Sequence, residues 1–333
     1  MVACAALSVL LVLYSPLALE GARQGLALCG QVIIPSLYPF FVLAGIFTGL
    51  GAGAGKARGR ALAGAVLLGF LGGYPLGAKT AAQLMEQGAL TRAQAQRLQL
   101  FCVNAGPAYL IGAVGAGMLG SRRAGVILFA SMLVSGLAMG AFTRFWPAQG
   151  DAAAVQPPAQ AQRKSMDHIL LTAVTQATGS ILGVCAWVVL FSCLCALLQL
   201  LPHGLWPAIP ALNVLLEVSS GSAAVLRAGM PLPVLCAALG WGGLGVHCQL
   251  LGDIRKTGLP LRLFWASRLL HGALGAAVCS ALVRWSPIEM PAAALWGAGR
   301  MVRLWTVSAP AAAAILFFCA FLIMDLDLNR KVC

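Results

Sequence analysis

Residues 69–107 read GFLGGYPLGAKTAAQLMEQGALTRAQAQRLQLFCVNAGP. One apolar run stops at Gly72-Gly73-Tyr74-Pro75, and a later one stops at Asn104-Ala105-Gly106-Pro107. Glycine and proline inside a spanning helix free backbone N–H and C=O groups that hydrocarbon cannot satisfy, so such breaks persist only in buried protein or beside a wet cavity. The stretch therefore predicts two interrupted helices, a feature that marks the binding sites of secondary transporters.

The composition is that of a membrane protein. Of 333 residues, 60% are hydrophobic and 9% are charged, against roughly a quarter charged in an average soluble domain. Several segments reach the roughly 20 apolar residues needed to cross the bilayer. The net charge of +13 comes from Lys and Arg spread through short loops, which is typical of membrane insertion. We therefore expect an all-α, multi-pass protein that contacts the lipid bilayer and no nucleic acid.

Residue patterns for metal, nucleotide or hydrolytic chemistry are missing from the sequence. Most of the 11 cysteines lie in apolar runs, Cys193 and Cys195 form only a CxC, and the four histidines are scattered. Small buried residues are the expected role of these cysteines. The sequence has no GxxxxGK[ST], HExxH or GxSxG, so direct ATP drive and intramembrane hydrolysis are not indicated. We expect no metal, no cofactor and no enzymatic activity.

Five parts are expected along the chain. They are a first transmembrane span (1–24), a first repeat half (25–147), a linker (148–165), a second repeat half (166–285) and a C-terminal anchor and tail (286–333). Val2–Leu19 has no basic n-region or cleavage site and is expected to be a retained span. Ile169–Leu201 exceeds one straight span, which favours a half-inserted helix leading into a full span from about Ile181. Leu304–Met324 is expected to be the last span.

An internal repeat strengthens the transporter interpretation. A shift of 170 positions places Gly72-Gly73 on Gly242-Gly243, Gly88 on Gly258 and Arg92 on Arg262. Both copies show an apolar run, a glycine break, an amphipathic stretch, a glycine, a basic residue and the next span. Paired interrupted segments in two halves point to a transporter site. We therefore expect two inverted halves with both breaks near the membrane midplane.

Six motifs together resemble a known family. They are IPSLYPFF (34–41), GGYPLGAK (72–79), NAGP (104–107), LLEVSSG (215–221), GGLGVHCQ (242–249) and RLLHG (268–272). In this order, over about Gly25 to Val283, they resemble the sporulation integral membrane protein YlbJ family, also called SpoVV. That family belongs to the wider group with a nucleoside recognition (Gate) domain, distantly similar to concentrative nucleoside transporters.

The resemblance implies a fold and a function. The fold would be all-α, with two inverted repeats and interrupted or re-entrant helices. The function would be transport of dipicolinic acid, a rigid aromatic dianion, across the outer forespore membrane of an endospore former by alternating access. The cell membrane is the other expected location. The coupling ion, the direction of transport and the formation of a homo-oligomer are left open.

Candidate substrate-binding residues flank the predicted breaks. They are Gly72, Gly73, Tyr74, Gly77, Lys79, Asn104, Glu217, Ser219, Ser220, Gly242, Gly243, His247, Gln249 and Arg268. Lys79 follows the restart of a half-helix, where free N–H groups and the helix dipole attract a carboxylate; the alternative is a lysine that snorkels to the interface. Glu217 is an acid in an apolar run, and we expect it to face the protein interior because a carboxylate against lipid is costly. It would bind a coupling proton or cation, or pair with Arg268 or Arg227.

Most of the remaining candidates also allow two interpretations. Asn104 offers a donor and an acceptor to a ligand, or caps a broken helix. His247 titrates near neutral pH or donates to a carboxylate, or else is a packing residue. Arg268 presents a planar fork suited to a carboxylate. Tyr74 and Trp241 either stack on an aromatic solute or pack.

Two other functions compete with transport of a small organic anion. One is a non-transporting membrane scaffold or partner subunit, whose breaks pack against another protein. The other is a transporter of nucleoside-like solutes. Saturable uptake into proteoliposomes separates a transporter from a scaffold.

Overall fold

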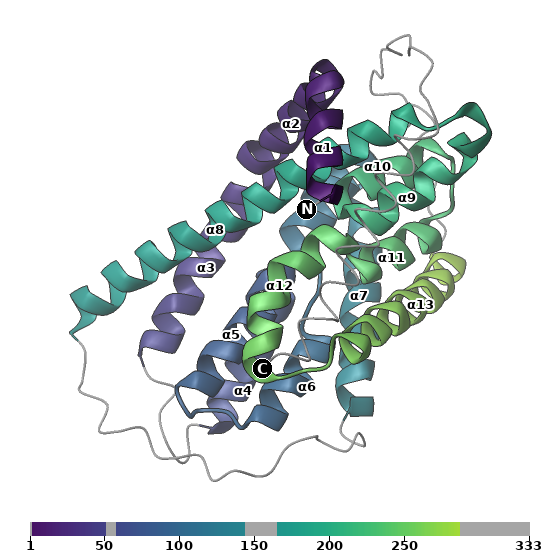
Figure 1. The fold of residues 1–333 in the computed structure, drawn as a ribbon. Helices are drawn as coiled ribbons and strands as arrows, with labels where there is room; N and C mark the ends of the chain where they lie inside the picture. Colours follow the sequence, from purple (N-terminus) through teal and green to yellow (C-terminus); the bar gives the residue numbers. More distant parts are fainter. Residues whose placement is uncertain (1, 51–57, 144–164, 287–333) are drawn as a thin grey trace.

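The computed structural model describes residues 2–50, 58–143 and 165–286, and every regular element in these ranges is a helix (Figure 1). The first half contains α1 (Val2–Leu13), α2 (Ser15–Leu28), the π-helical segment η1 (Cys29–Ile33), α3 (Ile34–Gly49), α4 (Arg58–Leu71), α5 (Tyr74–Glu86), α6 (Arg92–Phe101), the π-helical segment η2 (Ala108–Met118) and α7 (Arg122–Phe142). The second half contains α8 (Met166–Leu197), the short 3₁₀ helices η4 (Leu198–Leu200) and η5 (His203–Ala208), α9 (Ile209–Leu216), α10 (Val218–Arg227), α11 (Leu232–Trp241), α12 (Gly243–Thr257) and α13 (Leu261–Trp285).

Five stretches of the described chain are long and apolar enough to cross a membrane. They are Ser15–Gly49, Arg122–Phe142, Met166–Leu200, Leu232–Thr257 and Leu261–Trp285. An all-α, multi-pass membrane protein is thereby confirmed. The expected linker and C-terminal anchor, including Leu304–Met324, lie outside the described residues except for Ser165 and Ser286.

The N-terminal stretch differs from the expected single span. α1 ends at Leu13, and the chain turns at Tyr14 before Pro16, which occupies the first turn of α2. Proline favours the start of a helix because its missing N–H would be unpaired there anyway. α2 then continues through η1 into α3, so Ser15–Gly49 forms one long helix. The expected boundary at residue 24 therefore falls inside a helix.

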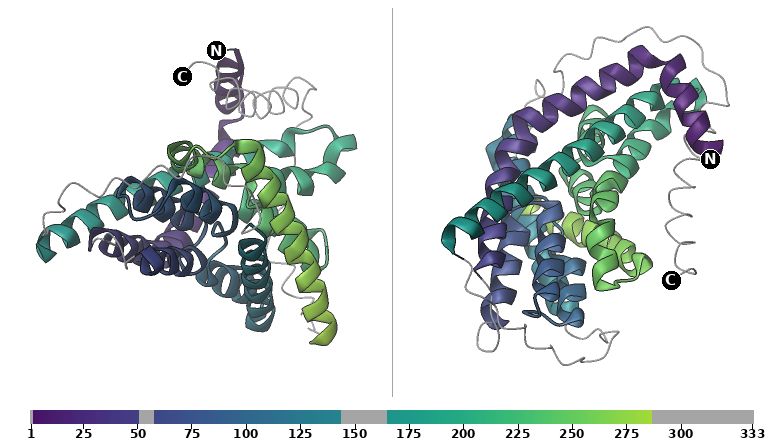
Figure 2. Two further views of the ribbon diagram at one scale, coloured as in Figure 1. Left: turned by 90° about the horizontal axis from the view of Figure 1, so that it is seen from below. Right: turned by 60° about the vertical axis from the view of Figure 1, so that its left-hand side comes forward.

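The long helix Ser15–Gly49 packs antiparallel against α8. Gly21 lies against Cys193, and Gly45 lies against Ala173, so contact is made along the length of both helices. Small residues let helix backbones approach closely within a membrane. α8 is one continuous helix of 32 residues, so the residues before and after Ile181 belong to the same helix. Figures 1 and 2 show α8 and the continuous α2–α3 helix as the two longest helices of the structure.

The same order of elements occurs twice. Each half begins with a long helix, followed by two half-helices that are separated by a break. A turn then leads to a third half-helix, a second break, another helix and a final long helix. The turns also match, because Gly88 and Gly229 follow α5 and α10, while Gly120 and Gly258 precede α7 and α13, all four with positive φ. The element order thus pairs α4, α5, α6 and η2 with α9, α10, α11 and α12.

This pairing changes the register expected from the sequence. The 170-residue shift aligns α5 and α6 with α12 and α13, yet α6 ends at Phe101 whereas α13 continues unbroken to Trp285. The turn glycines instead give an offset of about 140 residues, since Gly88 matches Gly229 and Gly120 matches Gly258. In that register Gly73 corresponds to Glu217 by its place in the order of elements.

The paired half-helices of the two halves lie at opposite ends of the structure. In Figure 1, α4 and α5 are at the lower end, while α9 and α10 are at the upper end. A buried cluster that includes Tyr74, Val103, Met132, Leu239 and Phe264 joins residues of both halves. The breaks between half-helices are therefore enclosed by the protein.

Candidate functional site

The two breaks of the first half touch each other. Gly73, between α4 and α5, has a φ of +86°, which side-chain-bearing residues rarely adopt. A methyl group at Gly106, in the break between α6 and η2, would lie 3.1 Å from the backbone nitrogen of Gly73. Glycine at both places lets the two backbones meet. The predicted interruptions at Gly72-Gly73 and Asn104–Pro107 are confirmed.

The second half has a matching pair of breaks. Glu217 is extended, with φ −145° and ψ 129°, and separates α9 from α10. Gly242, with a φ of +84°, separates α11 from α12, and Gly243, with a φ of +81°, is the first residue of α12. A methyl group at Gly243 would lie 3.0 Å from the Cα atom of Glu217. The predicted glycine break is confirmed, and the break at Glu217 is an additional one.

The breaks of the two halves also meet. A methyl group at Gly242 would lie 3.3 Å from the ring of Tyr74. The Tyr74 hydroxyl donates a hydrogen bond of 2.6 Å to the carbonyl oxygen of Leu239, at the end of α11. Tyr74 therefore anchors the start of α5 to the last turn of α11.

A cavity of about 60 Å³ opens at this convergence. Its walls include Gly73, Tyr74 and Pro75 of the α5 start, Gly106 and Tyr109 of the η2 break, Glu217, Val218 and Ser219 of the α10 start, and Gly245, Val246 and Gln249 of α12; Val32, Ile33, Ser36, Leu37, Val184 and Val188 close it from the long helices. This space holds roughly four water molecules.

Glu217 places a carboxylate at this cavity. Its side chain is 3% exposed, and Oε2 accepts a 2.7 Å hydrogen bond from the backbone N–H of Ser220. A carboxylate that caps a helix N-terminus is stabilised as an anion by the free N–H groups and the helix dipole. Ser219, beside it, accepts a hydrogen bond of 3.2 Å from the Tyr109 hydroxyl. The predicted interior position of Glu217 is confirmed.

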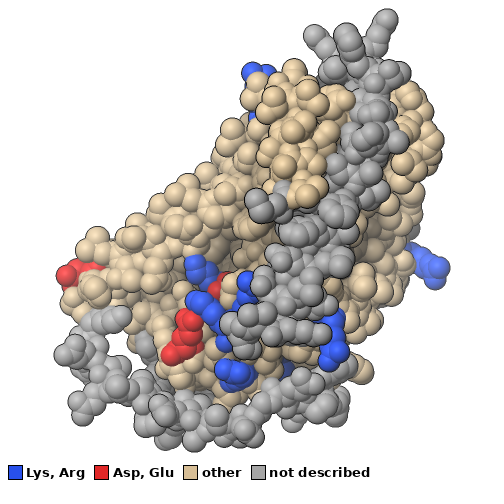
Figure 3. Space-filling model, viewed as in Figure 1, with Lys and Arg blue, Asp and Glu red and all other residues tan. Residues whose placement is uncertain are grey.

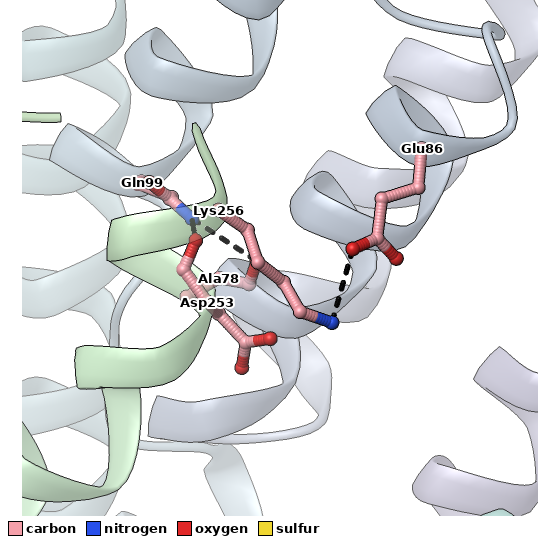
Figure 4. Close-up of polar contacts among 5 residues, drawn as sticks. All are labelled: Ala78, Glu86, Gln99, Asp253 and Lys256. Carbon is pink, nitrogen blue, oxygen red and sulfur yellow. Dashed lines mark hydrogen bonds and ion pairs between the residues drawn. The ribbon is translucent and has the colours of Figure 1, made fainter. Parts of the chain in front are cut away.

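A second polar cluster joins the two halves through α5, α6 and α12, in the lower part of the molecule as viewed in Figure 1. Lys256 of α12 reaches Glu86 of α5 at 3.1 Å, and Gln99 of α6 donates to the backbone oxygen of Asp253 at 3.0 Å (Figure 4). Thr257 donates to the side-chain oxygen of Gln99 at 2.6 Å. Figure 3 shows acidic and basic side chains side by side in this lower region. We call this set, Glu86, Gln99, Asp253, Lys256 and Thr257, the α5–α12 latch.

The contact between α5 and α12 and the contact between α10 and η2 differ in how closely the helices pack. By the order of elements, the contact of α5 with α12 corresponds to that of α10 with η2. α5 packs closely against α12 and is held by the latch, whereas α10 makes few contacts with η2 beyond the hydrogen bond between Tyr109 and Ser219. The two corresponding contacts therefore differ in how closely the helices pack.

Five of the predicted site residues line the cavity, namely Gly73, Tyr74, Glu217, Ser219 and Gln249. The predicted Gly72, Gly242 and Gly243 form the breaks without lining it. Ser220 contributes its backbone N–H to Glu217. Gly77 is needed for packing, because a side chain there would strike the carbonyl group of Cys102.

Lys79 does not line the cavity. Its ammonium group donates to the hydroxyl of Ser180 on α8 and lies 5.6 Å from the centre of the Phe41 ring on α3. Lys79 thus joins α5 to the two long helices. In this arrangement the ammonium group of Lys79 neither extends freely to the membrane interface nor reaches a solute in the cavity.

Arg268 is enclosed rather than presented to the cavity. Its side chain is 1% exposed, and its guanidinium donates to the carbonyl oxygens of Leu100 and Val103, where α6 ends. A broken helix leaves its last carbonyls without partners, and hydrocarbon offers none. Arg268 therefore supplies hydrogen-bond donors to the carbonyl oxygens that the break between α6 and η2 leaves without partners. It forms no ion pair with Glu217 among the described residues.

Asn104 and His247 are also enclosed. Asn104 donates from Nδ2 to the carbonyl oxygen of Phe101 at 2.8 Å, which is the capping role. His247 Nε2 pairs with the carbonyl oxygen of Trp241 at 2.9 Å, and its ring packs edge-on against Trp241 and Phe264. Both residues support breaks rather than line the cavity.

Sequence reasoning did not select Tyr109, Ser36 or Gly106. Tyr109 and Ser36 each lie in or next to a π-helical segment, η2 or η1. Such segments are rare and frequent at functional sites, but the sequence carries no simple signal for them. Of these three residues, only Gly106 could have been selected from the sequence, because it belongs to the NAGP motif.

Comparison with known proteins identifies a similar integral membrane protein. The chain is 26% identical over 321 residues to the sporulation integral membrane protein YlbJ of Bacillus subtilis (strain 168), covering 81% of this chain and 78% of that protein. It is a relative of YlbJ. No family model matches the chain, and no solved structure matches it. The similarity covers most of the chain, while a Gate domain stays a prediction.

Proposed function

We propose that this protein moves a small organic solute across a membrane by alternating access around the four breaks. The observation that carries the proposal is the unequal pair of contacts: α5 packs closely against α12 and is joined to it by the latch, while α10 and η2 are joined mainly by the hydrogen bond between Tyr109 and Ser219. If the two halves are inverted repeats, loosening the α5–α12 contact and tightening the α10–η2 contact would expose the cavity to the other side of the membrane. The position of α4–α5 and α9–α10 at opposite ends supports that inversion (Figure 1).

Dipicolinate is the first solute to test, because the resemblance to the YlbJ family implies it. The cavity offers one feature suited to a carboxylate. α5 starts at the cavity with Gly73 as its N-cap and without a side-chain cap, whereas α10 at the corresponding place is capped by Glu217. A solute carboxylate would take at α5 the position that Glu217 takes at α10. Tyr74 and Tyr109 flank this place and suit an aromatic ring.

Uptake of radiolabelled dipicolinate into proteoliposomes is expected to be saturable and at least about tenfold above that of protein-free liposomes. Unlabelled nucleoside is expected not to compete. Saturable uptake of labelled nucleoside without dipicolinate flux would favour the nucleoside-like solute instead. A lack of saturable flux for either solute would favour the scaffold.

The latch gives a second test of the same proposal. Lys256→Glu replaces an attraction with a repulsion and is expected to change the uptake rate up to about fivefold, because an exposed ion pair contributes about 0.2 to 1 kcal/mol to the equilibrium between two states. Its side chain and that of Glu86 are both about half exposed. The double variant Glu86→Lys, Lys256→Glu is expected to restore the rate.

The matched control for the latch is Arg255→Glu, which makes the same charge change on the exposed neighbour of Lys256. Arg255→Glu is expected to leave uptake within about twofold of wild type. If both single variants change the rate equally, or if the double variant fails to restore it, the latch does not regulate access.

A further inference from the structure

Three arginines gather where α7 begins and α13 ends. Arg122 and Arg123 are the first two residues of α7, and Arg284 lies in the last turn of α13. The guanidinium of Arg123 donates a hydrogen bond to the hydroxyl of Ser286, which directly follows α13, so the two helix ends are in contact. All three arginine side chains are exposed. We call Arg122, Arg123 and Arg284 the arginine cluster.

The positive charge of the arginine cluster is not balanced by the helices that carry it. Neither α7 nor α13 contains an acidic residue, and the three arginines form no ion pair with any described residue. Arg122 and Arg123 lie in the first turn of α7, where the helix dipole disfavours a cation and attracts an anion. In Figure 3, basic side chains project where α13 ends in Figure 1, and no acidic side chain lies beside them on the face shown.

The arginine cluster lies where two candidate membrane spans meet the membrane surface. One span, Arg122–Phe142, begins there, and another, Leu261–Trp285, ends there. Trp285, the neighbour of Arg284, is 90% exposed. Tryptophan is enriched at the boundary between hydrocarbon and water, at the level of the lipid headgroups. The arginine cluster is therefore expected at the depth of the headgroups.

We propose that the arginine cluster binds the headgroup of an anionic phospholipid and thereby joins α7 to α13. Guanidinium groups bind phosphate oxygens through paired N–H donors, and basic pockets between membrane helices bind anionic headgroups. A zwitterionic headgroup carries its own cation, so its attraction to three arginines is weaker. A free phosphate ion lacks the acyl chains that would cover the exposed ring of Trp285. Because α7 belongs to the first half and α13 to the second, the lipid would hold the two halves together at this surface.

Thermal unfolding of the purified full-length protein in a neutral detergent tests this proposal. Phosphatidylglycerol is expected to raise the melting temperature by about 3 °C over phosphatidylcholine with the same acyl chains, at tenfold above its dissociation constant. The rise is expected to saturate. Inorganic phosphate at equal ionic strength is expected not to reproduce it. An equal rise with phosphatidylcholine would indicate a general lipid effect, and an equal rise with phosphate would indicate a site for a free anion; either result would overturn the proposal.

Substitutions at Arg284 test the cluster with little risk to folding, because this side chain is exposed and makes no hydrogen bond to a described residue. Arg284→Gln is expected to raise the phosphatidylglycerol concentration for half-maximal effect about fivefold, whereas Arg284→Lys, which keeps the charge, is expected to stay within about twofold of wild type. The matched control is Arg262→Gln, at the exposed opposite end of α13. It is expected to leave the lipid dependence unchanged. Equal effects of Arg262→Gln and Arg284→Gln would show that only net charge matters.

Glu289 is the acid nearest to Arg284 in the sequence, and it lies outside the described residues. Glu289→Gln removes this carboxylate as an alternative partner of the arginine cluster. It is expected to keep the rise in melting temperature with phosphatidylglycerol. A lower melting temperature of Glu289→Gln without lipid, together with no response of the wild type to phosphatidylglycerol, would assign the arginine cluster to Glu289 instead of a lipid.

Discussion

Replacing Arg268 by leucine is expected to lower the free energy of unfolding by about 2 to 6 kcal/mol, since two buried carbonyl oxygens lose their donors at about 1 to 3 kcal/mol each. These oxygens belong to Leu100 and Val103, where α6 is interrupted. Thermal unfolding in detergent, followed by size-exclusion chromatography, measures the loss. Arg268→Lys is expected to be intermediate, because an ammonium group cannot reproduce the planar fork.

Arg262→Leu is the matched control for this prediction. Arg262 lies on the same helix, α13, but is exposed, so its replacement is expected to change the free energy of unfolding by less than about 0.5 kcal/mol. A normal melting temperature of Arg268→Leu together with lost solute binding would instead assign Arg268 to the solute.

Gly106→Ala is expected to reduce uptake at least about tenfold, which corresponds to about 1.4 kcal/mol. The added methyl group would lie 3.0 Å from the carbonyl oxygen of Leu71 and 3.1 Å from the nitrogen of Gly73. Because these neighbours are backbone atoms, the two breaks must move apart at the wall of the cavity, and overpacking of this kind costs about 1 to 3 kcal/mol. Initial rates of uptake, normalised to inserted protein, measure the effect.

Gly112→Ala provides the control for that experiment. Gly112 is exposed on the adjoining η2 segment, and a methyl group there meets no atom within 4 Å. It is expected to transport at the wild-type rate. Equal rates for Gly106→Ala and wild type would show that the crossing of the breaks does not form the path of the solute.

The interruptions illustrate what local sequence can predict. Gly72-Gly73, Asn104–Pro107 and Gly242-Gly243 were detectable because glycine and proline act on the backbone wherever they occur. The break at Glu217 was not predicted. Its backbone is extended without glycine or proline, and it is stabilised by the capping of α10 and by the close approach of Gly243.

The candidate site was predicted in part. Enclosure of Glu217 followed from the cost of placing a carboxylate against lipid. The partners of Lys79 and Arg268 did not follow, because Ser180 and the Leu100 carbonyl are 101 and 168 positions away in the chain. A charged side chain beside a helix break can pair with several kinds of partner. The packing of the helices determines which partner it meets.

The amino-acid sequence by itself determined the membrane class, the helical content and the places where glycine and proline interrupt helices, since these depend on composition and on local backbone chemistry. Tertiary structure decided which breaks meet and which residues face the cavity. It also decided the register of the repeat, because glycine matches at an offset of 170 compete with those at about 140 until the order of the helices is known. The physical reason is that contacts between Gly106 and Gly73, or Gly243 and Glu217, depend on the approach of separate helices.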